Sequence, residues 1–315
     1  MDVLTNILSD VQFQSSFYFR TDLTAPWSVY VPPKGHVARL HIVTGGHGWV
    51  QVEGQSENVP IANGDLVIIP HGAGHIIRGA PDTPPRMLDD VLSDVNYPGN
   101  GPLIYGGNGP STRLVCGELG FDDAIHPLIT DLPPLLYVSS KDSRSNMWLD
   151  STLSLIAHEA ITNQTGSLAI LNRLAEIIFI QTIRALANAP ETKIPFLAAL
   201  NDPQISLALG AIHRQPAAYF TIEKLGKIAG MSRSSFSNRF SELVGMTPYQ
   251  YLTLTRMQLA SRALSASNEP LMAISESVGY QSEAAFSTAF KRFFGVRPGE
   301  YRKQQGASTH GTFAK

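Results

Sequence analysis

Three side chains in the N-terminal half could bind a metal ion if the fold brings them together: His41, His75 and Cys116. Imidazole nitrogen and thiolate sulfur are ligands that zinc and similar ions accept. The alternative is that the two histidines are polar groups in the wall of a ligand pocket and that Cys116 is an inert buried thiol. Cys116 is the single cysteine of the chain, so no internal disulfide can form.

A second set of residues that could do chemistry lies in the C-terminal third, where the sequence repeats itself. A shift of 50 residues aligns Phe236, Ser237, Phe240, Gly245, Pro248 and Tyr251 with Phe286, Ser287, Phe290, Gly295, Pro298 and Tyr301. A fixed period of this kind indicates two copies of one structural unit.

Each copy predicts a helix, a turn and a second helix. The first helices span 222–229 and 271–278 and end at a glycine, which can take the left-handed conformation that closes a helix. Ser232 and Ser282 can cap the second helices. The expected buried stripes are Phe236, Phe240, Leu243 and Val244 in one copy and Phe286, Phe290 and Phe293 in the other. This is a helix-turn-helix, whose second helix enters the major groove of DNA; a helical bundle with duplicated packing is the alternative.

The faces opposite the phenylalanine stripes are therefore the expected DNA contacts. They are Arg233, Ser234, Ser237, Asn238 and Ser241 in the first copy and Ala284, Ser287, Thr288, Lys291 and Arg292 in the second. Arg and Asn make paired hydrogen bonds to base edges, whereas Lys and Arg at helix ends more often meet phosphates. The second face is small and less polar, which favours the reading of methyl groups and DNA shape.

Charge is distributed unevenly along the chain. From Asn201 onward, 13 Lys and Arg stand against 7 Asp and Glu, a net charge of +6, whereas the 11 basic and 19 acidic residues before it give −8. A basic end on an acidic body suggests a module that binds a polyanion, joined to a domain of another kind. Solvated surface charge is the alternative.

Composition indicates an ordinary globular protein, with 43% apolar and 16% charged residues. No apolar run reaches the roughly 18 to 20 residues that a membrane span requires. The first ten residues lack the basic and apolar regions of a secretory signal. We expect a cytoplasmic protein with no membrane segment.

Short strands punctuated by Gly and Pro are expected over residues 1–140, which predicts an antiparallel barrel or sandwich. The strands are expected at 38–43, 48–52, 66–69, 75–78, 113–118 and 135–138.

Two helices are expected within 146–188, inside a linker or dimerisation region of residues 141–195. A turn at Asn163–Gly166 separates them, and Leu171, Leu174, Ile177, Ile178 and Leu186 share one face of the second helix. That face either pairs two copies of the chain or covers the barrel. Prolines at 190, 195 and 203 mark the domain boundary, after which residues 200–304 form an all-α domain and 305–315 a disordered tail.

The C-terminal strings AGMSRSSFSNRF, GMTPYQYL, TRMQLASRAL and ISESVGYQSEAAFSTAFKRFFGVRPGEYR resemble the DNA-binding domain of AraC/XylS-family transcription regulators. The resemblance implies seven helices, with a long helix from Pro248 to Leu264 that holds the two units about one DNA turn apart. It further implies a homodimer on two half-sites and RNA polymerase as a partner. Ser275 and Glu276 depart from the small apolar pair that is usual in the family.

The N-terminal strings GDLVIIPHGAGH and HIVTGGHGWVQVEG resemble the second and first motifs of cupins, and PWSVYVPP, LVCGELGFD and HPLITDLPPLL resemble the cupin sensor domain of AraC-type regulators. The first-motif His-x-His and Glu of cupin enzymes are absent, and Arg39 stands where the Glu is expected. The resemblance implies a ligand-sensing barrel without an assigned cofactor; a divalent metal at His41, His75 and Cys116 is the less favoured alternative. The candidate wall residues are Trp27, Tyr30, His41, Trp49, His75 and Cys116.

The expected architecture is α+β: an N-terminal antiparallel β-barrel of the cupin type, a helical linker, and an all-α domain with two helix-turn-helix units. The expected function is sequence-specific transcription regulation, in which the barrel senses a small molecule of unknown identity and modulates binding to double-stranded promoter DNA. No catalytic residues are expected. The alternatives are a metal-dependent cupin enzyme with an accessory DNA-binding domain, and a constitutive DNA-binding protein whose barrel serves only dimerisation.

Overall fold

The computed structural model describes residues 2–10, 13–99, 101–121, 126–141, 146–162, 164–189 and 192–310. The chain divides into two compact units, Gln12–Glu191 and a second unit that joins Met1–Val11 to Thr192–Lys315. The change from one unit to the other lies beside Pro195, inside the proline-punctuated segment of the sequence. In the described part of the chain, no helix combines the length and the apolar character needed to span a membrane.

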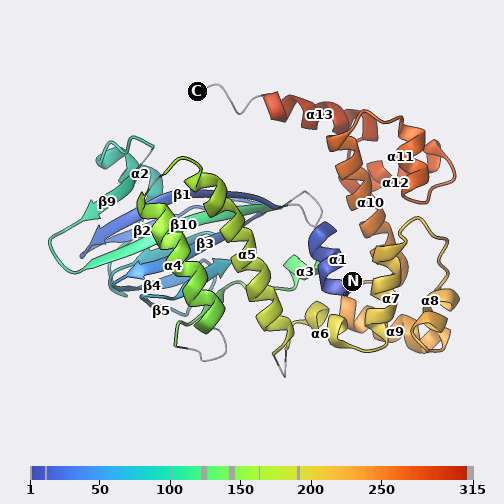
Figure 1. Ribbon diagram of the computed structural model, residues 1–315, viewed down its shortest axis with the longest axis horizontal. Helices are drawn as coiled ribbons and strands as arrows, with labels where there is room; N and C mark the ends of the chain where they lie inside the picture. The colour runs from blue at the N-terminus through green and yellow to red at the C-terminus, as the bar shows by residue number, and fades with distance from the viewer. Residues whose placement is uncertain are drawn as a thin grey trace. The chain divides into compact units, whose positions relative to one another are not determined.

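Two β-sheets form the first unit (Figure 1). The six-stranded sheet has the order β11 (Leu136–Val138), β6 (Leu66–Ile69), β3 (Val37–Gly45), β10 (Ser111–Phe121), β1 (Phe13–Thr24) and β9 (Pro102–Gly106). The five-stranded sheet has the order β5 (Val59–Ala62), β4 (His47–Val52), β7 (His75–Arg78), β2 (Ser28–Val31) and β8 (Arg86–Met87). The strand pairs are antiparallel, apart from β9 beside β1 and β8 beside β2, which run parallel.

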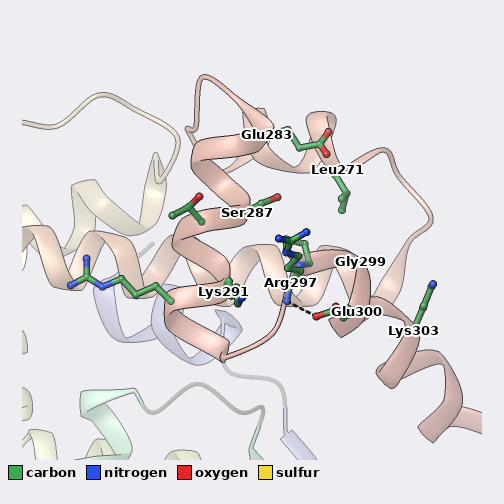
Figure 2. Close-up of a pocket in the computed structure, with 11 residues that line it drawn as sticks. Leu271, Glu283, Ser287, Lys291, Arg297, Gly299, Glu300 and Lys303 are labelled. Atoms are coloured by element: carbon green, nitrogen blue, oxygen red, sulfur yellow. Dashed lines mark hydrogen bonds between the residues drawn. The ribbon is translucent and has the colours of Figure 1, made fainter.

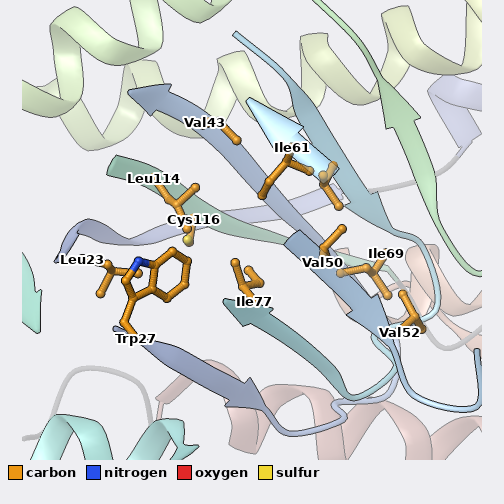
Figure 3. Close-up of a cluster of buried hydrophobic side chains, with 11 residues drawn as sticks. Leu23, Trp27, Val43, Val50, Val52, Ile61, Ile69, Ile77, Leu114 and Cys116 are labelled. Carbon is orange, nitrogen blue, oxygen red and sulfur yellow. The ribbon is translucent and has the colours of Figure 1, made fainter. Parts of the chain in front are cut away.

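The apolar core of this unit lies between the sheets, as Figure 3 shows. β1, β3, β6 and β10 supply residues such as Leu23, Val43 and Leu114, and β4, β5 and β7 supply Val50, Ile61 and Ile77 from the other side. Successive side chains of a strand point to opposite faces, so every second residue of these strands enters the core. The expected cupin-type sheet domain is confirmed.

Two helices cover the outer face of the six-stranded sheet (Figure 1). α5 (Ser167–Ala187) packs on β1 and β10, and α4 (Asn146–Thr162) packs on α5 and β3. Phe179 of α5 lies edge-on to Phe13 of β1, with ring centroids 5.5 Å apart. The apolar face of α5 therefore covers the sheet, although Ile177, expected on that face, is exposed.

Short helices complete the first unit: α2 (Leu88–Asp94) beside β2 and β8, and α3 (Pro127–Thr130) after β10. The first helix, α1 (Val3–Asp10), instead packs on α7 (Ile205–Arg214) of the second unit. Ile7 of α1 is fully buried. By its contacts α1 therefore goes with the C-terminal helices, because its apolar side is buried against them.

From Pro195 to His310 the second unit contains eight helices: the seven that the resemblance implied for the DNA-binding domain, and one more before them. After α6 (Pro195–Asn201) and α7 follow α8 (Ile222–Ile228), α9 (Arg233–Val244), α10 (Pro248–Ala266), α11 (Leu271–Ser277), α12 (Glu283–Phe294) and α13 (Pro298–His310). α6 is the added helix, and Phe196 on it is fully buried and stacks on Tyr251 of α10. α13 continues to His310, beyond the expected start of a disordered tail at residue 305; residues 311–315 lie outside the described part.

Candidate nucleic-acid interface and ligand cavity

The first helix-turn-helix has the caps that its sequence predicts. α8 is closed by Gly230, whose φ of +65° suits a residue without a Cβ atom. Ser232 then begins α9, and its hydroxyl accepts a hydrogen bond from the Ser235 backbone amide. Phe236 and Phe240 are fully buried and fix the inner face of α9.

The outer face of α9 carries the expected base-reading residues. Arg233, Ser234 and Asn238 are exposed, and Ser237 and Ser241 are half-buried along the same helix. The Arg233 guanidinium lies 3.0 Å from the Glu223 carboxylate of α8, with both side chains well exposed. An exposed ion pair of this kind is weak, so a DNA phosphate can compete for Arg233.

An ion pair anchors α9 to the helices behind it. The Asp202 carboxylate accepts hydrogen bonds from the Ile205 backbone amide at 2.8 Å, which caps α7, and from Arg239 of α9. Burial alone would raise the pKa of Asp202, but the hydrogen bonds from Ile205 and Arg239 lower it below its ordinary value. Arg239, which was not expected at the site, holds the orientation of α9.

The second helix-turn-helix repeats this design with a different surface. Gly279, at φ +84°, closes α11, and Ser282 caps α12 by accepting from the Ala285 amide. On the outer face, Ala284, Thr288, Lys291 and Arg292 are exposed and Ser287 is half-buried. The Thr288 hydroxyl donates to the Ala284 carbonyl at 2.9 Å, so its proton is used within the helix, and its methyl group and the acceptor side of its oxygen remain for a ligand.

Burial on α12 differs from the expected stripe at one position. Phe286 and Phe290 are fully buried, but Phe293 is exposed, whereas Phe294 packs against the core of this half. A helix turns 100° per residue, so a position seven residues after Phe286 has drifted towards the edge of the buried face. The prediction of Phe293 as a core residue was wrong.

A broad depression of about 770 Å³ lies beside α12, shown in Figure 2. It brings together Ser287, Thr288, Lys291 and Arg292 with residues that the sequence reasoning missed, among them Arg297 and Lys303. Four cations line it against the two carboxylates of Glu283 and Glu300. The missed signal was the start of α13 at Pro298, because a helix N-terminus and nearby cations together attract phosphate.

A small cavity of about 40 Å³ lies within the first unit, between the two sheets. Its wall is almost entirely apolar and is formed by Thr21, Leu23, Trp27, Val29, Val31, His41, Ile77, Leu88, Leu103, Leu114 and Cys116. Three expected wall residues, Trp27, His41 and Cys116, are among them. Figure 3 shows Trp27 and Cys116 among the buried side chains of the core.

Tyr30 and Trp49 do not line this cavity, which corrects the expectation for both. The inward positions of β2 are Val29 and Val31 and those of β4 are Val50 and Val52, so the alternation of side chains places Tyr30 and Trp49 on the outer faces. The Tyr30 hydroxyl lies 3.2 Å from the Glu53 carboxylate. Trp49 is half-buried, edge-on to the His47 ring.

His41, His75 and Cys116 do meet, in a buried chain of polar contacts. His41 Nδ1 lies 3.2 Å from Cys116 Sγ, and His41 Nε2 lies 2.8 Å from His75 Nε2. The other nitrogen of His75, Nδ1, is 2.9 Å from the Ala73 carbonyl oxygen. His75 thus points inward, but stands behind His41 rather than in the cavity wall.

Burial keeps this triad neutral, and a nearby cation adds to the effect for the two histidines. Burial, together with the neighbouring His75 and Arg39, holds the pKa of His41 well below its ordinary value. Burial lowers the pKa of His75 to about 4 and raises that of the Cys116 thiol to about 12. At neutral pH the cavity therefore presents uncharged imidazole and thiol groups.

The triad does not fit a metal centre. His41 directs one ring nitrogen at Cys116 and the other at His75, so one ion could not bind all three residues in this arrangement. Arg39, in place of the expected acid, puts a buried cation next to the histidines. Among the described residues, no group of three His, Cys, Asp or Glu side chains is arranged to hold a metal ion.

Comparison with known proteins also divides the chain into an N-terminal and a C-terminal part, but it places α1 with the N-terminal part. Residues 2–188 match the family described as Cupin, and residues 225–304 match the family described as Helix-turn-helix domain. The first match ends beside α5, so it includes both helices that cover the sheet.

Relatives that match over nearly the whole chain are named as transcription regulators. The chain is 32% identical over 96% of its length to a "Putative AraC-like transcription regulator" of Streptomyces lividans, of which it covers 98%. It is 30% identical over 96% of its length to the "HTH-type transcriptional regulator AlkR" of Acinetobacter baylyi, of which it covers 100%. The structure of the DNA-binding domain of AdpA "in complex with a target DNA" is 30% identical, covers 35% of this chain and 98% of that domain, and has a TM-score of 0.33. The chain belongs to the family of AraC-like transcription regulators that join a cupin domain to a double helix-turn-helix domain.

Proposed function

We propose that this protein is a ligand-responsive regulator that binds promoter DNA with α9 and α12 in successive turns of the major groove. The observation that carries the proposal is the pair of capped helix-turn-helix units, each with a buried phenylalanine face and an exposed polar face. Arg233, Ser234 and Asn238 are the proposed base readers, supported by Ser237 and Ser241. On the second helix, Ala284, Ser287 and Thr288 read methyl groups and shape, and Lys291 and Arg292 contact phosphates.

The test is selection of binding sites from random duplex DNA by the full-length protein at several salt concentrations. A motif of two blocks about one helical turn apart, bound with a steep dependence on salt, is the expected result. Recovery of one block only, or binding that ignores salt, would contradict the two-unit reading.

The cavity supports a small, neutral and mainly apolar effector. Among the described residues that line it, none has a charged side chain, and the polar groups that reach it, from Thr21, His41 and Cys116, are uncharged at neutral pH. A charged ligand would be stripped of water with no partner of opposite sign.

Binding of an effector must move part of the wall. A volume of about 40 Å³ has room for a few water molecules, since one water needs roughly 10 to 15 Å³ of such space. Leu88 of α2 and Leu103 of β9 form one side of the wall, and Val91 of α2 packs with Leu103 in a small adjoining core. We propose that α2 shifts as the ligand enters, and that this changes the DNA affinity of the protein.

Screening of uncharged apolar and charged small molecules by thermal unfolding tests this proposal. A stabilising compound should come from the uncharged set, and Ile77→Trp, which fills the cavity, should abolish its effect. Stabilisation by charged compounds alone would contradict the assignment. We further propose that the protein acts in the cytoplasm, as a homodimer and with RNA polymerase as a partner, and that it acts by binding rather than by catalysis.

A further inference from the structure

α10 alone connects the two helix-turn-helix units as a continuous element. Its 19 residues span about 28 Å. Tyr251 near its start packs against Phe196 of α6 and Phe240 of α9, on the side of the first helix-turn-helix. Met257 and Leu264 belong to the apolar core of the second helix-turn-helix. In residues 192–310, no helix before α10 packs extensively on a helix after it, so the angle between α9 and α12 needs a further constraint.

Arg256, at the middle of α10, supplies contacts to both sides. Its Nε donates to the Pro216 carbonyl at 2.8 Å and its Nη2 to the Ala218 carbonyl at 3.0 Å, both in the loop between α7 and α8. Its guanidinium carbon also lies 5.8 Å from the centre of the Tyr280 ring, in the turn of the second helix-turn-helix. The Arg256 guanidinium therefore joins the loop before α8 of the first helix-turn-helix to the turn between α11 and α12 of the second.

Gly279 brings the two segments into direct contact. A Cβ atom at this position would lie 2.7 Å from the Ala217 carbonyl oxygen and 2.7 Å from Arg256 Nη2. Gly230 holds the equivalent place in the first helix-turn-helix and has a similar left-handed backbone, but a Cβ atom there would meet nothing within 4 Å. Of these two glycines, only Gly279 is needed for the close contact between the two helix-turn-helix units.

We infer that Arg256 and Gly279 are positioning residues that lock the two helix-turn-helix units at one angle and so set the spacing between the two DNA blocks that the protein accepts. The inference rests on the proposed two-block reading of DNA. Neither residue lies on the outer faces of α9 and α12. They act through the disposition of those helices, because half-site spacing follows from protein geometry.

The experiment measures affinity of the full-length protein for its selected site with the spacer lengthened or shortened by one base pair, which rotates one block by roughly 35° relative to the other. For the unaltered protein we expect a loss of about 10-fold or more on either change, on the scale of one unfavourable base pair. Arg256→Ala should reduce this penalty to less than about 3-fold, while contacts to each block persist.

Gly279→Ala and Gly230→Ala form a matched pair, since both place a Cβ atom on a left-handed residue. Gly279→Ala is expected to change the spacing profile and Gly230→Ala to leave it unchanged. Arg256→Lys, which keeps the charge but loses the forked pair of hydrogen bonds, should give an intermediate profile and decides the matter if Arg256→Ala does not fold.

Equal spacing profiles for the unaltered protein, Arg256→Lys and Gly279→Ala would overturn the inference. A uniform loss of affinity across all spacers in these variants would also overturn it, because it would show a role in stability alone. If the unaltered protein has no spacing preference, the two-block reading itself fails, which is a different result.

Discussion

At the scale of single residues, chemistry is divided between a neutral cavity and a polar helix face. His41, His75 and Cys116 are uncharged because burial disfavours the charged forms, and Arg39 adds to this effect for the histidines. Asn238 and Arg233 are exposed on α9, where a base or a phosphate can replace water. The first set suits recognition of an apolar molecule and the second suits recognition of DNA.

Asn238 is expected to read one base. Asn238→Ala should reduce discrimination at a single position of the site by about 1 to 3 kcal/mol, the range of one paired hydrogen-bond contact, and leave binding to unrelated DNA unchanged. Competition binding with single-base variants of the selected site measures this. Arg292→Ala is the matched control, since loss of a phosphate contact should weaken all sequences alike and lower the salt slope by about 1. A uniform loss for Asn238→Ala would show that it does not read a base.

The lowered pKa of His75 makes stability depend on pH. Because the unfolded chain takes up this proton near pH 6.5 and the folded chain only near 4, stability is fully present above about 6.5 and declines as pH falls towards 4. A shift of this size corresponds to at most about 3 kcal/mol. Thermal unfolding at pH 7.5 and 5 should show the loss, and His75→Gln should reduce it. An unchanged pH dependence in that variant would contradict the assignment.

At the scale of elements, caps and ion pairs place each recognition helix. Asp202 caps α7 and bonds to Arg239 of α9, so one carboxylate ties together helices that are distant in sequence. The capping box of Thr247 and Gln250 begins α10 directly after α9. The orientation of α9 therefore depends on elements that flank it on both sides.

Asp202→Ala should destabilise the C-terminal unit by about 1 to 2 kcal/mol, since the helix loses its cap. Asp202→Asn can still accept from the Ile205 amide and should lose less than Asp202→Ala. The half-exposed Arg239 contributes little to this difference. Urea unfolding of both variants provides the comparison, and equal losses would show that the charge, rather than the cap, is what matters.

At the scale of the whole molecule, the chain does not divide into domains in simple sequence order. α1 comes first in the chain but belongs with the C-terminal helices, and it packs on α7. The chain thus contributes both of its ends to the DNA-binding unit, with the sensor unit inserted between them.

Ile7→Ala tests the place of α1. The variant removes a fully buried side chain, and we expect a loss of about 2 to 4 kcal/mol that falls on the DNA-binding unit. Hydrogen exchange should then be faster in α7, with the strands of the sensor unit as the internal control. Faster exchange in the strands alone would place α1 with the sensor unit.

The sequence alone determined whatever depends on local periodicity and on resemblance. The 50-residue repeat and its caps located both helix-turn-helix units, and the ends of β6 and β7 were predicted to the residue, because Gly and Pro mark the turns around them. The C-terminal and cupin motifs located both families along the chain.

Tertiary structure alone decided which side chains meet. β3 and β10 pair so that His41 stands opposite Cys116, a register that no spacing in the sequence specifies. It also turned Tyr30 and Trp49 outward, exposed Phe293 and joined α1 to α7. The contact of Arg256 with the loop 40 and 38 residues before it likewise has no sequence signal. The physical reason is that local sequence fixes backbone conformation and periodicity, whereas contacts between distant segments follow from which surfaces are buried together.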